Sequence, residues 1–181
     1  MTPIIIGIGG GHSGVGKTTL ACRILGRLRG WGAIKYTKTS LYASIIDDRD
    51  ILSEEGKDTK RLLDAGAEKV LWIQSPFSQL EEILPIALEM LSHLEGIVVE
   101  GNSALGILNP DIIIFISGPD GKIKPGADRI LNRADVVIFE QNMPQGIPEG
   151  AKEFQMNEIE AILQWLTQKM QLTTESAEEC N

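Results

Sequence analysis

Residues 11–18 read Gly-His-Ser-Gly-Val-Gly-Lys-Thr, and this G-x-x-x-x-G-K-T pattern constrains the fold of the chain more than any other feature. Glycine at positions 11, 14 and 16 allows backbone conformations that a Cβ would forbid, so successive N–H groups can point at one anion. Lys17 can place its ammonium against the β- and γ-phosphates, and the Thr18 hydroxyl can take one position on Mg²⁺. The pattern therefore predicts a loop that binds nucleotide phosphates.

The segments on both sides of the motif are those that a phosphate-binding loop requires. Residues 3–9 are an apolar, mostly β-branched run, which predicts a buried parallel strand. Residues 19–29 carry leucine and isoleucine at helical spacing, so the positive end of a helix dipole faces the loop. We therefore predict a P-loop NTPase domain that binds a nucleoside triphosphate. The predicted nucleotide-binding residues are Ser13, Gly14, Val15, Gly16, Lys17, Thr18 and Thr19.

The composition limits the possible partners. A formal charge of −8 argues against DNA or RNA, whose phosphate backbones require a basic surface. No apolar run reaches the ~20 residues of a membrane span, and the N-terminal run has no basic residues before it, which predicts a strand rather than a signal peptide. Cys22 and Cys180 have no close partner in sequence and suit a reducing compartment. We predict a cytoplasmic protein with no nucleic-acid and no membrane partner.

Short apolar strands alternate with amphipathic helices along the chain. The pattern predicts strands over 3–9, 33–36, 69–73, 96–100, 112–117 and 135–139, and helices over 19–29, 58–65, 80–94, 127–133 and 157–170. Such alternation predicts an α/β fold with an open, mostly parallel β-sheet, helices on both faces and the ligand beyond the carboxyl ends of the strands. The predicted single domain covers residues 1–172, and the acidic segment 173–181 is predicted to be a disordered tail.

Three segments predict departures from regular structure. Residues 37–57 show no clear helix or strand period, and so long a connection in a compact domain is usually functional or mobile. Pro85 lies inside the predicted helix 80–94, where proline removes a hydrogen bond, so we expect a kink or an early end there. Residues 142–150 contain two prolines and two glycines, which predict a loop.

Two acids are candidates for a metal site. Glu100 ends an apolar strand and is followed by Gly101, so its carboxylate is expected beside the phosphate loop, where it can hold Mg²⁺ or a metal-bound water. Asp58 follows the long connection and can reach the same ion, or it can cap the following helix instead. We predict Thr18, Asp58 and Glu100 as metal ligands, and Lys17, Asp58 and Glu100 as the catalytic set.

Two lysines are candidates for binding a substrate. Lys35 and Lys38 follow the second predicted strand at the end where the ligand is expected. Their ammonium groups can hold the γ-phosphate or an anionic substrate, and the alternative is that both are ordinary surface lysines. The sequence leaves the choice open.

The motif at 11–20, Ile34-Lys35, Gly56-Lys57-Asp58-Thr59 and Val98-Val99-Glu100-Gly101 come in an order that resembles the molybdopterin-guanine dinucleotide biosynthesis protein B family. The resemblance extends from the N-terminus to about Gly101. It implies a small homodimeric accessory protein that binds GTP with Mg²⁺, hydrolyses it weakly and assists the guanylation of molybdopterin. Its implied partners are molybdopterin or a protein of molybdenum-cofactor biosynthesis. Carried over by position, the loop residues would bind phosphate, and Thr18, Asp58 and Glu100 would surround the metal.

The chain departs from this family in ways that leave alternatives open. Guanine-specific relatives carry Asn-Lys-x-Asp after the sixth strand, whereas residues 139–144 read Phe-Glu-Gln-Asn-Met-Pro, so the base, GTP or ATP, is undecided. The loop, the second-strand lysine and the two acids also resemble dethiobiotin synthetase-like enzymes. That resemblance implies a ligase or kinase acting on a small carboxylate. A third possibility is a nucleotide-switched maturation chaperone.

Overall fold

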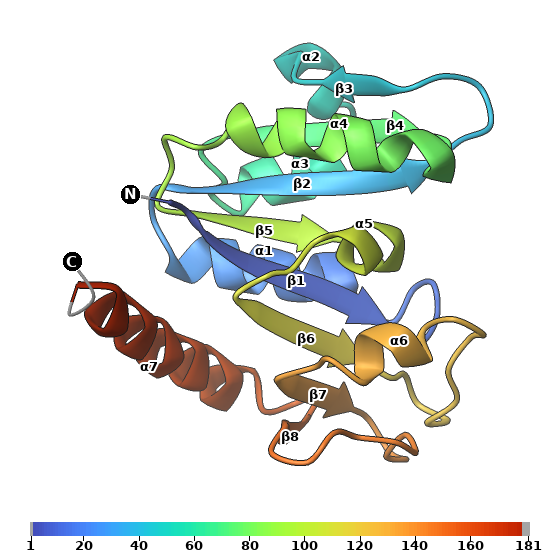
Figure 1. Ribbon diagram of the computed structural model, residues 1–181, viewed down its shortest axis with the longest axis vertical. Coiled ribbons are helices and arrows are strands. Elements are labelled where there is room, and N and C mark those ends of the chain that lie inside the picture. The colour runs from blue at the N-terminus through green and yellow to red at the C-terminus, as the bar shows by residue number, and fades with distance from the viewer. Residues whose placement is uncertain (1, 179–181) are drawn as a thin grey trace.

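One sheet of eight strands forms the centre of the computed structural model, which describes residues 2–178 and their side chains as far as Gln171 (Figure 1). The order across the sheet is β3-β4-β2-β5-β1-β6-β7-β8, and β3 is antiparallel to β4 while the other neighbouring pairs are parallel. The strands are β1 (Ile4–Gly10), β2 (Trp31–Lys38), β3 (Ser44–Ile46), β4 (Val70–Ser75), β5 (Gly96–Glu100), β6 (Ile112–Ile116), β7 (Val136–Phe139) and β8 (Lys152–Gln155).

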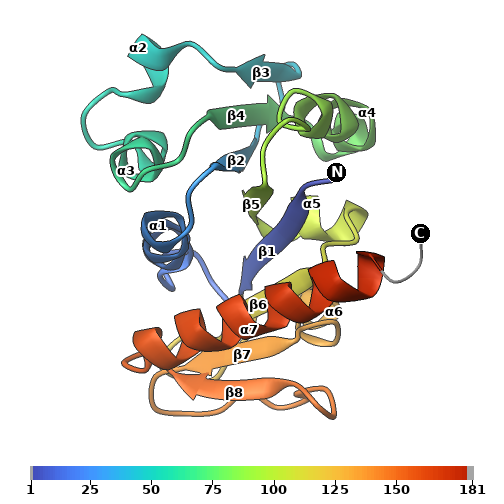
Figure 2. The same cartoon turned by 90° about the vertical axis from the view of Figure 1, so that its left-hand side faces the viewer.

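Helices cover both faces of this sheet. They are α1 (Lys17–Arg27), α2 (Arg49–Leu52), α3 (Asp58–Asp64), α4 (Phe77–Glu89), α5 (Asn102–Ile107), α6 (Asp128–Leu131) and α7 (Ile159–Glu178). Figure 2 shows α1 and α3 on one side of the strands and α4 and α5 on the other. The predicted α/β architecture, an open and mostly parallel sheet between helices, is confirmed.

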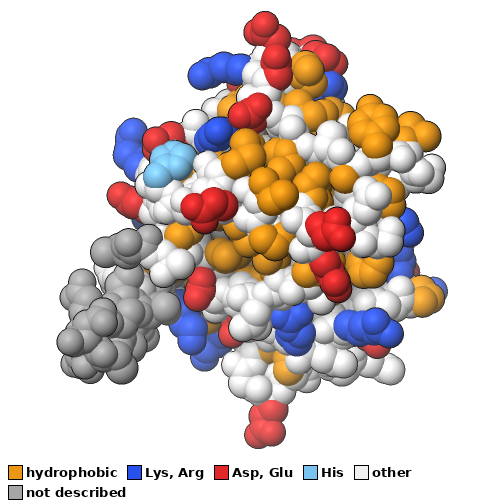
Figure 3. All heavy atoms as spheres, turned by 45° about the horizontal axis from the view of Figure 1, so that its top comes forward, with side chains coloured by type: hydrophobic (Ala, Val, Ile, Leu, Met, Phe, Trp, Pro, Cys, Tyr) orange, Lys and Arg blue, Asp and Glu red, His pale blue; other side chains and the backbone are white. Residues whose placement is uncertain are grey.

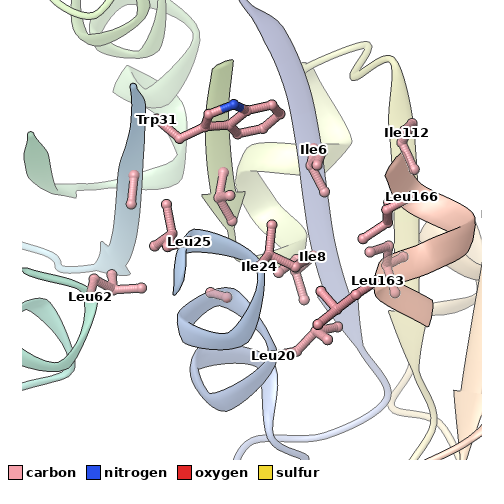
Figure 4. Close-up of a cluster of buried hydrophobic side chains, with 14 of the residues drawn as sticks. Ile6, Ile8, Leu20, Ile24, Leu25, Trp31, Leu62, Ile112, Leu163 and Leu166 are labelled. Atoms are coloured by element: carbon pink, nitrogen blue, oxygen red, sulfur yellow. The ribbon is translucent and has the colours of Figure 1, made fainter. Parts of the chain in front are cut away.

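The apolar interior consists of two clusters, one on each face of the sheet. The first, called the α1 cluster, contains the buried side chains of α1 and α7 packed on β1 (Figure 4). The second, called the α4 cluster, contains those of α4, α5 and α6. Neighbouring strand residues belong to different clusters, since Val98 lies in the first and Ile97 and Val99 lie in the second. Each fully buried aliphatic side chain contributes at most roughly 1.5–3 kcal/mol.

The segment 37–57 contains regular structure that the sequence did not reveal. β3 pairs antiparallel with β4, and its Ile45 and Ile46 pack against opposite clusters. The short α2 follows, and the Asp48 carboxylate accepts hydrogen bonds from the N–H groups of Asp50 and Ile51 at its start. Elements of three and four residues are too short to produce a detectable period.

Pro85 does not end the helix in which it lies. α4 runs from Phe77 to Glu89, and the exposed Pro85 stands on its solvent side between the buried Leu84 and Ala87. The carbonyl group that loses its N–H partner can therefore bind water, which makes the proline tolerable. The helix does not end at this residue, although it ends at Glu89 and not at the predicted residue 94, and the kink stays a prediction.

The carboxyl-terminal part differs from expectation in two places. Residues 142–150 are irregular, as predicted, but β8 follows them at the sheet edge, where its mostly exposed side chains give no apolar signal. α7 continues to Glu178, beyond the predicted end at Met170. Residues 179–181 of the predicted tail, including Cys180, lie outside the described residues, and the division into a domain and a tail remains a prediction.

The surface carries several exposed apolar side chains. Phe77 and Ile86 of α4 are 51% and 57% exposed, and Leu41 and Tyr42, between β2 and β3, are 78% and 63% exposed. Figure 3 shows apolar side chains gathered on one face of the molecule, with charged side chains around them. None of the helices within residues 2–178 combines the length and the apolar character that crossing a membrane would require.

Candidate functional site

The loop 11–18 joins β1 to α1, and its glycines are required by the backbone. Gly14 and Gly16 have φ angles of +76° and +96°, a region that residues with a Cβ rarely adopt. A Cβ on Gly11 would lie 2.7 Å from the Ser117 carbonyl oxygen. Gly16 caps α1 without a side-chain hydrogen bond, so the first N–H groups of the helix remain available to an anion.

Lys17 lies over this loop. Its Nζ donates a hydrogen bond to the His12 carbonyl oxygen at 3.1 Å. Burial lowers the pKa of Lys17, the nearby Glu100 opposes this shift, and the ammonium of Lys35 adds to it. A partly desolvated ammonium that faces other cations is stabilised by a bound polyanion, so the position favours phosphate binding.

Glu100 is the acid closest to the loop. Its side chain is buried at the end of β5, which pairs directly with β1. The Thr18 hydroxyl donates toward both of its oxygens, at 3.0 Å from Oε1 and 2.9 Å from Oε2. A buried carboxylate requires a cation or several hydrogen bonds in its surroundings. Thr18, in the first turn of the helix after the loop, supplies a hydrogen bond.

Lys35 provides the cation. It stands opposite Glu100 in the register of β2 and β5, and its Nζ lies 2.8 Å from Glu100 Oε1 and 2.8 Å from Asp58 Oδ2. Thr18 Oγ1 is 3.4 Å from the same nitrogen. Burial works against the charged form, but the charges and hydrogen bonds of Glu100 and Asp58 outweigh it and raise the pKa of Lys35.

Asp58 does not act as the cap of α3. The cap residue is Lys57, which makes no side-chain cap hydrogen bond, and Asp58 is the first residue of the helix. Its carboxylate accepts from Lys35 and also from Arg61 Nη1 at 3.2 Å. Burial alone would raise the pKa of Asp58, but the hydrogen bond and charge of Lys35 lower it. Arg61, which sequence reasoning did not place in the site, reaches Thr19 Oγ1 at 2.9 Å.

Lys38 lies apart from this cluster. Strand side chains alternate between faces, so a spacing of three residues places Lys38 on the opposite face from Lys35. Lys38 is exposed and does not line the cleft described below. The intervening Tyr36 is buried in the α4 cluster, and its hydroxyl donates to the Ser75 carbonyl oxygen at 3.0 Å.

Two clefts meet along the loop. One, of about 390 Å³, is lined by loop residues together with Lys35, Asp58, Arg61 and Glu100. The other, of about 600 Å³, lies beyond the ends of β6, β7 and β8, where Asp120, Glu140 and Met156 line it with the opposite side of the loop. Together they provide a polar part suited to phosphates and a wider, mostly apolar part suited to a nucleoside. Asp120, Glu140 and Met156 are not among the site residues predicted from the sequence.

The loop is anchored by groups that are distant in sequence. The Asn102 side chain accepts from the N–H of Gly10 at 2.8 Å and donates to its carbonyl oxygen at 2.9 Å. On the other side, the Lys124 N–H donates to the Gly11 carbonyl oxygen at 2.9 Å, and its Nζ reaches Ser13 Oγ at 3.0 Å. The start of the loop is thus held between α5 and the segment that follows β6.

Replacing Asn102 with alanine is expected to destabilise the fold by about 1–3 kcal/mol, because the two partly buried backbone groups of Gly10 lose their partner. Chemical denaturation measures this change. Asn132→Ala, at an exposed position beyond α6, is the matched control and should stay within about 0.5 kcal/mol of the parent. Equal stability of both variants would mean that water replaces the two hydrogen bonds between Asn102 and Gly10.

A metal ion would have to rely on few protein ligands. The described residues contain no group of three or more His, Cys, Asp or Glu side chains that could hold one. The hard oxygen donors that converge near the loop are the Thr18 hydroxyl and the carboxylates of Asp58 and Glu100. One or two carboxylates, water and substrate phosphates are what Mg²⁺ uses in nucleotide sites, so this donor set fits that ion.

No protein-family model and no curated protein sequence matches the chain. Solved structures do. HypB from Helicobacter pylori in complex with nickel has a TM-score of 0.60 at 15% identity, covering 95% of this chain and 89% of that one. LpxK from Aquifex aeolicus in complex with ATP has a TM-score of 0.52 at 19% identity, covering 86% of this chain and 54% of that one. These likenesses and the loop geometry show the P-loop NTPase fold.

Proposed function

We propose that the protein binds a nucleoside triphosphate with Mg²⁺ and slowly hydrolyses its terminal phosphoanhydride. The observation that carries the proposal is the Thr18 hydroxyl, which lies 2.9 and 3.0 Å from the two carboxylate oxygens of the buried Glu100, in a cleft that the phosphate loop lines. In this arrangement the hydroxyl that can bind a metal and the acid at the end of β5 are already in contact. A loop that bound phosphate only for structural reasons would not require an acid there.

Each group of residues has a stated role in this proposal. The backbone N–H groups from Ser13 to Thr19 and the Lys17 ammonium bind the phosphates. Thr18, Asp58 and Glu100 hold the metal, directly or through water, and the metal neutralises charge on the phosphate oxygens. Lys17, Asp58 and Glu100 form the catalytic set: the Lys17 ammonium would stabilise negative charge that develops on the terminal phosphate, and the two carboxylates would act through the metal or a metal-bound water.

The proposal leaves the nucleobase of the triphosphate undecided. GTP is favoured by the resemblance to the molybdopterin-guanine dinucleotide family, and ATP is the alternative. The wider cleft presents the carboxylates of Asp120 and Glu140, which accept hydrogen bonds. Guanine offers N1–H and N2 amino donors and adenine offers its N6 amino group, so both purines have donors for these acids.

Thermal unfolding with GTP, ATP and their diphosphates, each with and without Mg²⁺, tests the proposal. A triphosphate at 100 times its dissociation constant stabilises the folded state by about 2.7 kcal/mol. We expect this stabilisation for one purine triphosphate with Mg²⁺ and a smaller one without the metal. If no triphosphate raises the unfolding temperature at millimolar concentration, the protein is not a nucleotide-binding protein.

The pathway rests on the sequence resemblance. We propose that the protein is cytoplasmic, forms a homodimer and assists the guanylation of molybdopterin, in contact with that pterin or with a molybdenum-cofactor biosynthesis protein. The exposed apolar side chains of Leu41, Tyr42 and Phe77 supply area for such contacts. The expected result is faster formation of the dinucleotide in a reconstituted guanylation assay when the protein and GTP are both added. Unchanged formation would reject this pathway.

A second candidate function has one observation in its favour. A small hollow of about 120 Å³ borders Lys35, Lys57 and Asp58 beside the phosphate cleft. The Lys35 ammonium, which borders both the hollow and the phosphate cleft, could hold a small carboxylate, as a ligase or kinase would require. Turnover stimulated by a small carboxylate, with phosphate transferred to it, would favour this function over the accessory role. Lys38, which the sequence grouped with Lys35, faces away from the hollow.

A further inference from the structure

The ammonium of Lys35 occupies the point on which the three proposed metal ligands converge. Its contacts to Glu100 and Asp58 are both 2.8 Å long, and Thr18 Oγ1 lies 3.4 Å away. Mg²⁺ binds oxygen at about 2.0–2.1 Å. An ammonium and a metal ion therefore cannot share the same three oxygens, because their mutual repulsion and the shorter metal distances exclude it.

The electrostatics explain why a cation is needed there when no metal is present. The Glu100 side chain is 4% exposed, and an isolated carboxylate at that burial is strongly unfavourable. Lys35 is 18% exposed and comes from the adjacent strand, so its charge is fixed opposite Glu100 by the register of β2 and β5. Its flexible four-carbon stem allows the ammonium to move while the strand stays in place.

We propose that Lys35 is a built-in substitute for the metal. It holds the metal position in the nucleotide-free protein, compensates Glu100 and Asp58, and must leave this position for Mg²⁺ to bind. The metal ion alone then binds weakly, since it competes with an internal cation, and the phosphates of the nucleotide supply the additional ligands that displace Lys35. The inference deepens the proposed function and rests on its metal site.

Replacing Lys35 with methionine tests the inference without any nucleotide. Methionine keeps much of the length of the side chain and removes its charge. At pH 8, binding of Mn²⁺ measured by electron paramagnetic resonance should become at least about 10-fold tighter than in the parent. In the same variant, the unfolding temperature should fall in EDTA and recover in Mg²⁺. Lys38→Met is the matched control, because it removes the same charge from the exposed end of the same strand, and it should bind Mn²⁺ as the parent does.

Each possible outcome either supports or overturns the inference. Mn²⁺ binding by Lys35→Met that is no tighter than in the parent overturns the inference, and so does equally tight binding by the double variant Lys35→Met with Glu100→Gln. If Lys35→Met does not fold, Lys35→Gln, whose amide still donates to Glu100, takes its place. Folding of either variant only with Mg²⁺ supports the inference, and failure to fold even with the metal overturns it. These Mn²⁺ measurements use no nucleotide. A failure of triphosphates to bind would therefore reject the proposed function, and the measurements would still test the role of Lys35.

Discussion

Replacing Lys17 with alanine is expected to weaken binding of the nucleoside triphosphate roughly 10- to 150-fold and to leave the fold intact. The reason is the loss of a charge-assisted contact worth about 1.5–3 kcal/mol. In the absence of ligand, the structure gives Lys17 one hydrogen bond, to the carbonyl oxygen of His12 in the same loop. Little of the packing depends on it, so the loss should appear in binding rather than in stability.

Isothermal titration calorimetry measures this effect, and circular dichroism confirms the fold. Lys122→Ala is the matched control. Lys122 is exposed near the same loop, and its backbone carbonyl, which the mutation keeps, accepts from His12 Nε2 at 2.7 Å. Removal of an exposed charge should change the affinity by no more than about fivefold, given the small worth of exposed charge interactions. Equal losses in both variants would reveal a general charge effect and reject a specific contact of Lys17 with phosphate.

Replacing Glu100 with glutamine is expected to reduce Mg²⁺-dependent hydrolysis roughly 10- to 100-fold, because the site loses a charged oxygen donor and the group that orients Thr18. The amide keeps the shape of the side chain but presents one acceptor oxygen instead of two. The Thr18 hydroxyl, which now contacts both oxygens at 2.9 and 3.0 Å, would lose its orientation toward the metal. Phosphate binding should largely survive, because the loop itself is unchanged.

Asp58→Asn should act in the same direction but less, because Asp58 is more exposed than Glu100. If both acids serve one ion, the double variant should lose less hydrolysis than the sum of the two single losses, each expressed as a free energy. Steady-state phosphate release across a Mg²⁺ titration measures all three variants, with the exposed Glu89→Gln as control. Normal turnover of Glu100→Gln at every Mg²⁺ concentration would show that this acid is a bystander, and the metal assignment would then be wrong.

The sequence predicted the parts of the fold that depend on local signals. The loop can be located from its motif alone. The buried strands can be recognised as apolar runs without information from other parts of the chain. β8 was missed because an edge strand with exposed side chains resembles a loop, and α5 was missed because six residues after Gly101 are too few for a helical period.

The site was predictable only to the level of its elements. The sequence placed Lys17 and Glu100 near one another because strand ends meet at one edge of a parallel sheet, and it offered Asp58 as a second acid only because it follows the long connection. It could not show that Lys35 stands opposite Glu100, because the register between β2 and β5 is decided by packing across the whole sheet. Asn102 and Lys124 contact the loop from 92 and 111 residues away, and neither separation leaves a sequence signal.

The sheet also has a consequence for engineering of this molecule. Its backbone separates the α1 cluster, which adjoins the phosphate loop through Leu20 and Val15, from the α4 cluster on the other face. Substitutions beneath α1 act on the helix that begins at the loop, so they will alter ligand binding and stability together. Substitutions beneath α4, for example at Ile83, are shielded from the loop by a layer of hydrogen-bonded strands. The positions beneath α4, as opposed to those near α5 and the segment after β6 that hold the loop, are the place for spectroscopic probes or stabilising changes that leave the ligand site undisturbed.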